Sequence, residues 1–130
     1  MNDILFRGKS NLSKEPYWVE GYFFKIGDRY YIVDQRCDTF AQKYFTPVDP
    51  NTIGQWTGLT DCNCKKIFDG DVVVINESIQ MSYVVTMRNF KWVLVNDLLG
   101  EGFYHELENN SERYKVVSNI HDIKNTLDNE

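Results

Sequence analysis

Two cysteines separated by a single residue, Cys62 and Cys64, are the first side chains whose types and spacing could carry chemistry. Two thiolates at this spacing can share a metal ion, with Cys37, His105 or His121 as further ligands. Structural zinc sites, however, usually combine two ligand pairs at a wider spacing. The chain holds three cysteines and no second pair. We therefore predict no metal site and interpret the cysteines as reduced thiols.

Three aspartates, Asp61, Asp69 and Asp71, lie on neighbouring turns of the expected fold. Carboxylates placed in this way could bind Mg²⁺ for phosphoryl chemistry. Aspartate is also common in turns because its side chain bonds to nearby backbone groups. We interpret all three as structural residues.

His105 and His121 could pair with the Cys37 thiol as a base and a nucleophile. Neither histidine lies in a recognisable catalytic sequence. The chain also lacks the glycine-rich nucleotide loops, the zinc-protease motif and the nucleophile elbow. We therefore expect no catalytic residues, no cofactor and no enzymatic activity.

Aromatic residues make up 15% of the chain, and several fall on one expected hairpin. Exposed aromatic rings interleaved with Lys or Arg can stack the bases of single-stranded nucleic acid. On strands, such rings more often form the core and cross-strand pairs. As weak binding candidates we retain Trp18, Tyr22, Trp56 and Trp92.

The charge of −5 is concentrated in the C-terminal quarter of the 130 residues. This imbalance argues against a broad phosphate-binding face and predicts weak or no binding to duplex DNA. No apolar run approaches the roughly 20 residues of a membrane span, and no secretory leader is recognisable. We expect a cytoplasmic protein that does not bind membranes.

Alternating apolar residues and turn signals predict two β-hairpins. The first joins strands at Tyr17–Ile26 and Arg29–Asp34 through Gly27-Asp28, and the second joins Ser82–Arg88 to Lys91–Asn96 around Asn89. Further strands are expected at Ile4–Phe6 and Tyr114–Ile120, a polar loop at Asn76–Met81, and a helix cap at Asp122. The patterns at Asp38–Phe45 and Asp97–Asn110 do not decide between structures.

The rest of the chain is organised around the stretch Ile53–Ile75, which predicts a strand, a turn, a strand, a second turn and a third strand. Asp49-Pro50 before it favours one helical turn. Glycines at 54 and 58 bracket Gln55 and Trp56, and we expect Trp56 to be largely buried beside them.

Several blocks in this order resemble the YopX family, small proteins of unknown function encoded mostly by phages and prophages. The matching blocks are ILFRGKS at 4–10, WVEGY at 18–22, GQWTGL at 54–59, IFDGDVV at 67–73 and VVSNIHD at 116–122. The structural motif comprises Gly54, Gln55, Trp56, Gly58, Asp61, Asp69, Gly70 and Asp71. Asn63-Cys64 stands where the family has Asn-Gly, and Ser118 replaces a glycine. A positive φ at Cys64 would cost about 1 kcal/mol.

These observations together predict a mainly β protein with little helix. We expect an N-terminal β-hairpin region at residues 1–48 and a small antiparallel SH3-like barrel at 49–130, sharing one compact unit. The resemblance and the missing catalytic motifs favour a phage- or prophage-derived protein-interaction module in a bacterial host. Its partner would be a host or phage protein, and the chain could form a homo-oligomer. The alternative is a nucleic-acid-binding small barrel that uses exposed aromatics.

Overall fold

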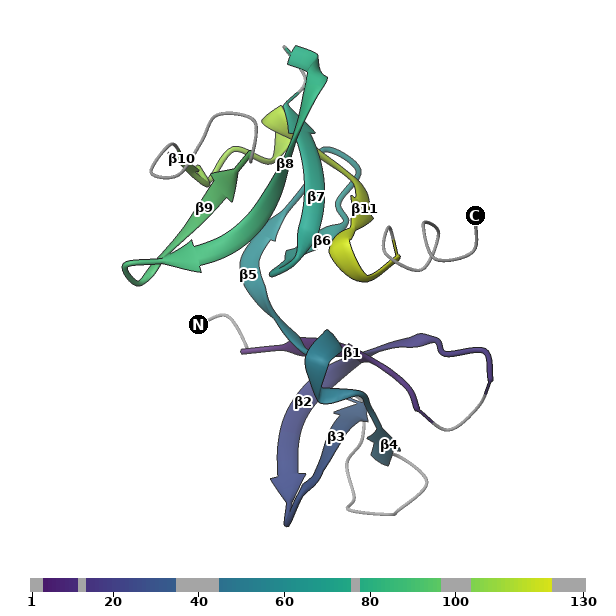
Figure 1. Ribbon diagram of the computed structural model, residues 1–130. Coiled ribbons are helices and arrows are strands. Elements are labelled where there is room, and N and C mark those ends of the chain that lie inside the picture. The colour runs from purple at the N-terminus through teal and green to yellow at the C-terminus, as the bar shows by residue number, and fades with distance from the viewer. Residues whose placement is uncertain (1–3, 12–13, 35–44, 76–77, 97–103, 123–130) are drawn as a thin grey trace. The chain divides into compact units, whose positions relative to one another are not determined.

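The computed structural model describes residues 4–11, 14–34, 45–75, 78–96 and 104–122. The chain divides into two compact units, Met1–Trp56 and Thr57–Glu130. The boundary expected after residue 48 lies within the first of these units. Both units are built from antiparallel strands, so the prediction of a mainly β protein is confirmed (Figure 1).

The first unit is a twisted sheet whose strands follow the order β4-β3-β2-β1-β5. Its elements are β1 (Phe6–Lys9), β2 (Trp18–Ile26), β3 (Arg29–Asp34), β4 (Phe45–Pro47), the 3-10 turn η2 (Pro50–Thr52) and the start of β5 (Gly54–Thr60). The helical turn predicted at Asp49-Pro50 is confirmed, because the Asp49 carboxylate accepts the Asn51 N–H at 3.0 Å.

The hairpin predicted between β2 and β3 is confirmed, with Ile26 paired to Arg29 across the turn. Gly27 has φ +61°, which suits the first central residue of a mirror-image two-residue turn. Two strand predictions nearby were incomplete. Strand β1 begins at Phe6 instead of ending there, because its register is set by pairing with β2. Strand β4 was not anticipated, because its three residues carry too short a pattern.

The second unit contains the remainder of β5 and six further strands. These are β6 (Lys66–Phe68), β7 (Asp71–Ile75), β8 (Ser78–Arg88), β9 (Lys91–Val95), β10 (Tyr104–Glu106) and β11 (Tyr114–Asn119), with the 3-10 turn η4 (Ser111–Arg113) before β11. Five of them form a sheet in the order β10-β9-β8-β7-β11. This sheet does not close into a barrel within the described residues. For this unit, the broad prediction of an antiparallel β fold is confirmed.

One face of the five-stranded sheet carries the hydrophobic core of the second unit. Its buried members are Ile67, Val73, Tyr83, Val85, Leu94, Tyr114 and Val116. Alternate residues of a strand share a face, so the even spacing of these side chains along β7, β8 and β11 brings them together. Trp92 and Leu59 pack against this cluster from its margin.

The order of elements predicted for Ile53–Ile75 is confirmed by β5, β6 and β7 and by the turns between them. Gly58 and Gly70 both have φ +90°, a conformation that side chains with a Cβ rarely adopt. A Cβ on Gly70 would meet the Ile120 side chain at an ordinary contact distance of 3.5 Å, so the constraint there is the backbone conformation and not the space. The glycines therefore fix the path of the backbone at these two points.

The second predicted hairpin is confirmed, but β8 begins at Ser78, inside the segment expected to be a polar loop. Pairing with β7 determines this start, since Ile75 pairs with Ser78 across a shift in register. The turn consists of Asn89 and Phe90, whose φ angles are +53° and +66°. Such turns normally take Asn-Gly, and a positive φ at a bulky residue costs about 1–2 kcal/mol.

A helical segment begins after β11, at residues 120–122, and its cap differs from the prediction. The Asn119 side-chain oxygen accepts the N–H groups of His121 and Asp122, at 3.1 and 2.9 Å. Asp122 instead accepts a bond from the Asn119 amide at 2.7 Å. Asn119 is therefore the cap. Of the helical segments in the described residues, none combines the length and apolar character that crossing a bilayer requires.

Candidate functional site

The Asp61 carboxylate lies in the turn between β5 and β6 and is 2% exposed. One oxygen, Oδ1, accepts the N–H groups of Asn63 and Lys65 at 2.8 and 2.9 Å. The other, Oδ2, accepts the N–H of Val116 on β11 at 2.9 Å. Beside it, the Cys62 N–H donates to the Tyr114 carbonyl at 2.8 Å. The turn is thereby fastened to the last strand of the unit.

The protonation of Asp61 follows from these contacts. Burial of the carboxyl would raise its pKa, but the backbone hydrogen bonds from Val116, Lys65 and Asn63 and the Lys65 charge act in the opposite direction. The pKa of Asp61 consequently lies below its ordinary value of 3.8. Asp61 is thus a buried anion that organises backbone donors.

Of the other two aspartates of the predicted trio, Asp69 lies in the turn before β7 and Asp71 is the first residue of that strand. Asp71 is fully buried and accepts the Phe68 N–H at 2.7 Å. Asp69 is partly exposed. Within the described ranges, no three His, Cys, Asp or Glu side chains gather into a group that could hold a metal ion.

Two of the three cysteines lie in the turn that Asp61 organises. Cys62 and Cys64 are exposed free thiols, and Cys37 lies outside the described residues. Cys64 has φ +63° and donates its N–H to the Asp61 carbonyl at 3.0 Å. The strained conformation anticipated at Cys64 is therefore present.

The two histidines belong to different elements of the second unit. His105 is an exposed residue of β10 whose ring meets Tyr83 edge-on, with 5.9 Å between the ring centroids. His121 lies at the start of the helical segment after Asn119. The thiol suggested as their nucleophilic partner, Cys37, lies outside the described residues.

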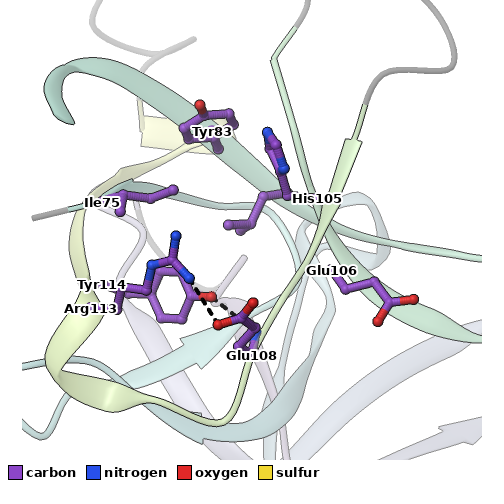
Figure 2. Close-up of a pocket in the computed structure, with 8 residues that line it drawn as sticks. Ile75, Tyr83, His105, Glu106, Glu108, Arg113 and Tyr114 are labelled. Carbon is purple, nitrogen blue, oxygen red and sulfur yellow. Dashed lines mark hydrogen bonds and ion pairs between the residues drawn. The ribbon is translucent and has the colours of Figure 1, made fainter. Parts of the chain in front are cut away.

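A pocket of about 360 Å³ opens beside His105 (Figure 2). Its lining comprises Ile75, Tyr83, Leu94, His105, Glu106, Glu108, Arg113 and Tyr114. Two of its polar groups bind their own neighbours. Arg113 pairs with Glu108 at 2.8 Å, and the Tyr114 hydroxyl accepts the Glu108 N–H at 2.9 Å.

Sequence reasoning missed this pocket because five strands and the η4 segment contribute to it. Part of its lining also comes from the segment 97–110, whose pattern was ambiguous. Its volume falls within the range of small-ligand sites.

In the first unit, two cations on the neighbouring strand β1 lie over the Trp18 indole. The Arg7 guanidinium carbon is 4.6 Å from the centroid of a Trp18 ring, and the Lys9 ammonium is 5.4 Å from it. Arg7 is only 7% exposed, so this stacking is largely shielded from water. Trp18 itself is partly buried.

Alternation along β2 places Trp18, Glu20, Tyr22, Phe24 and Ile26 on one side of the strand, and we call this side the β2 face. Tyr22 is 43% exposed and Ile26 is 59% exposed. Two of the four binding candidates, Trp18 and Tyr22, therefore share one face.

The other two candidates have different surroundings. Trp56 is partly buried on β5, so the expectation of a largely buried indole is met only in part. Its backbone N–H donates to the Leu5 carbonyl at 2.8 Å. On the same strand, Gly54 and Gln55 pair with β1. Trp92 belongs to the second unit and packs on its core.

Comparison with known proteins links nearly the whole chain to one family. No curated protein gives a match. The family model described as "YopX protein" matches residues 5–128. This span includes the Asp61 turn, the β2 face and the pocket. The chain therefore belongs to the YopX family.

Proposed function

We propose that this protein is a non-enzymatic binding module and that the β2 face contacts another protein. The observation that carries the proposal is the exposure of Tyr22 and Ile26 on one side of a single strand. Large apolar side chains grouped on a surface mark contact sites more often than scattered ones do. Tyrosine is also among the residues enriched at protein interfaces.

The charges around the β2 face favour a protein partner over nucleic acid. Arg7, the cation nearest to Trp18, is buried against the indole. Glu20, which pairs with Arg7 across the strands, is exposed between Trp18 and Tyr22. A carboxylate in this place would repel a phosphate backbone, whereas the rim of a protein interface accommodates it readily.

Single-stranded nucleic acid remains the second candidate, because two cation and aromatic pairs lie in the same sheet. Lys9 stacks over Trp18, and the Lys25 ammonium lies 5.3 Å from the centroid of the Tyr30 ring. Aromatic rings beside lysines can hold successive bases and phosphates. In this reading the aromatics would stack bases instead of packing on apolar side chains.

The wider proposal places the protein in the cytoplasm of a bacterial host, with a host or phage protein as its partner. The support is its family resemblance together with the absence of a recognised catalytic motif in the sequence. An SH3-like arrangement of the second unit belongs to the same proposal, supported by the turn at Asp69-Gly70 that leads into β7.

Site-specific crosslinking tests the proposal. A photoreactive phenylalanine analogue replaces Tyr22 in one variant and Val117, which is 51% exposed on β11, in the control. We expect a partner protein to be crosslinked at position 22 and not at position 117. Once purified, this partner should bind the wild-type protein. A labelled oligothymidine is titrated in parallel. Binding of the oligonucleotide without any position-specific protein crosslink would overturn the proposal and favour the second candidate.

A further inference from the structure

Phe90 is the most exposed large apolar residue in the described part of the chain, with 97% of its surface accessible. It occupies the tip of the β8–β9 hairpin and has φ +66°. Met87, near the tip on β8, is 45% exposed. The hairpin therefore presents a phenyl ring to solvent from a backbone conformation that favours glycine.

Among the described residues, the contacts of Phe90 within its own chain are too few to offset these two unfavourable features. A ring that is 97% exposed makes few van der Waals contacts with its own chain. Strained backbone conformations cluster at functional sites, and exposed apolar groups often mark contact surfaces. Phe90 thus has the properties of an anchor that is buried in a complex.

The pocket of the second unit has the size and lining to receive such an anchor. Its volume is about 360 Å³, and an apolar cavity of about 150 Å³ already accepts a benzene ring. Ile75 and the buried Leu94 supply apolar surface. The rim holds two carboxylates, and Figure 2 shows the Glu106 side chain pointing away from Glu108.

The charges of the hairpin tip and of the pocket rim are complementary. Arg88 and Lys91 flank the Asn89-Phe90 turn and pair with each other across the hairpin. The rim carries Glu106 and Glu108, which within one copy form exposed ion pairs with Lys91 and Arg113 that a partner's cations can replace. Opposite charges at the edge of an interface steer association and fix its register.

The tip and the pocket rim also lie side by side within one copy, because the Lys91 ammonium and the Glu106 carboxylate are 2.9 Å apart. Two copies related by a two-fold axis near this ion pair could each place a tip at the pocket of the other. Such a reciprocal contact closes after two copies. We infer that the protein forms a homodimer in which Phe90 of each copy enters the pocket beside His105 of its partner.

Mass measurements test this inference first. Light scattering over a concentration series is expected to approach twice the 15.3 kDa of one chain. Phe90→Ser should remain monomeric at every concentration. The control Val117→Ser removes another exposed apolar side chain, outside the tip and the pocket, and should dimerise like the wild type. A wild-type monomer throughout the series, or a Phe90→Ser dimer, would overturn the inference.

An NMR experiment then locates the contact. Isotope-labelled Phe90→Ser keeps an intact pocket, and unlabelled wild type supplies the tip. The expected result is a shift of the Ile75, Leu94 and Glu108 amide signals on addition of wild type, and no shift on addition of unlabelled Phe90→Ser. Shifts confined to the β2 face, or binding of a labelled oligothymidine that depends on Phe90 without any dimer, would contradict the assignment.

Discussion

The carboxylate of Asp61 accepts the backbone N–H of Val116 at 2.9 Å, across 55 residues of sequence. A turn between two early strands of the second unit is thus held to its last strand by a buried anion. Two further N–H groups share the carboxylate, so its removal would leave several donors short of a partner. This contact connects the Ile53–Ile75 stretch to β11.

Asp61→Asn should destabilise the second unit by about 2–3 kcal/mol, because an amide retains only one accepting oxygen. The measurement is urea unfolding followed by fluorine NMR of fluorotryptophan-labelled protein, in which Trp92 reports on the second unit. Glu106→Gln is the control, since it removes an exposed carboxylate and should cost less than about 1 kcal/mol. Equal effects of the two substitutions would show that the Asp61 contacts contribute little.

The contribution of Asp61 to the stability of the second unit should decrease as the pH falls. Because folding lowers its pKa, the carboxylate contributes fully above its ordinary value of 3.8, and this contribution is lost as the pH falls through the lower folded value. The difference in unfolding free energy between wild type and Asp61→Asn should therefore shrink from about pH 5 to about pH 2. A difference that stays constant over this range would contradict the lowered pKa.

Cys64→Gly should stabilise the second unit by about 0.5–1 kcal/mol, because glycine adopts φ +63° without the steric cost of a Cβ. Cys62, in the same turn, is not among the residues with positive φ. Cys62→Gly should therefore be neutral or destabilising. Urea midpoints of the two variants under reducing conditions provide the comparison, and a gain of equal size in both would refute the backbone explanation.

Phe90→Gly should also stabilise the second unit, by about 1 kcal/mol, because it creates the Asn-Gly sequence that this turn prefers. Phe90→Ala serves as the matched control, since it removes the ring but keeps a Cβ at positive φ. Thermal unfolding at low protein concentration separates this local effect from association. If Phe90→Ala stabilised the second unit as much as Phe90→Gly, the exposed ring of Phe90 and not its strained backbone would explain the gain in stability.

The sequence predicted those parts of the fold whose signals are local. Gly27-Asp28 between alternating apolar residues identified the first hairpin, and Asp49-Pro50 identified the 3-10 turn. Strands β4 and β10 have three residues each, so neither carries a readable pattern. The early start of β8 depends on its pairing with β7, which overrides the polar composition.

The candidate sites were less accessible to sequence reasoning because they depend on contacts between distant segments. Asp61 was recognised as a turn residue, but its bond to Val116 exists only once β11 is in place. The pocket draws its lining from segments between Ile75 and Tyr114. The turn at Asn89 was expected, whereas the exposure of Phe90 was not, because a phenylalanine between two strands usually indicates a buried residue.

The most direct measurement of the central claim is the affinity of the crosslinked partner, once purified, for wild type and for the double variant Tyr22→Ser/Ile26→Ser. Both residues are exposed, so the variant should fold normally. If the β2 face contacts a protein, titration calorimetry should show binding weakened at least tenfold in the double variant, equivalent to about 1.4 kcal/mol, and unchanged in Val117→Ser. Equal affinity of the double variant and the wild type would contradict the account.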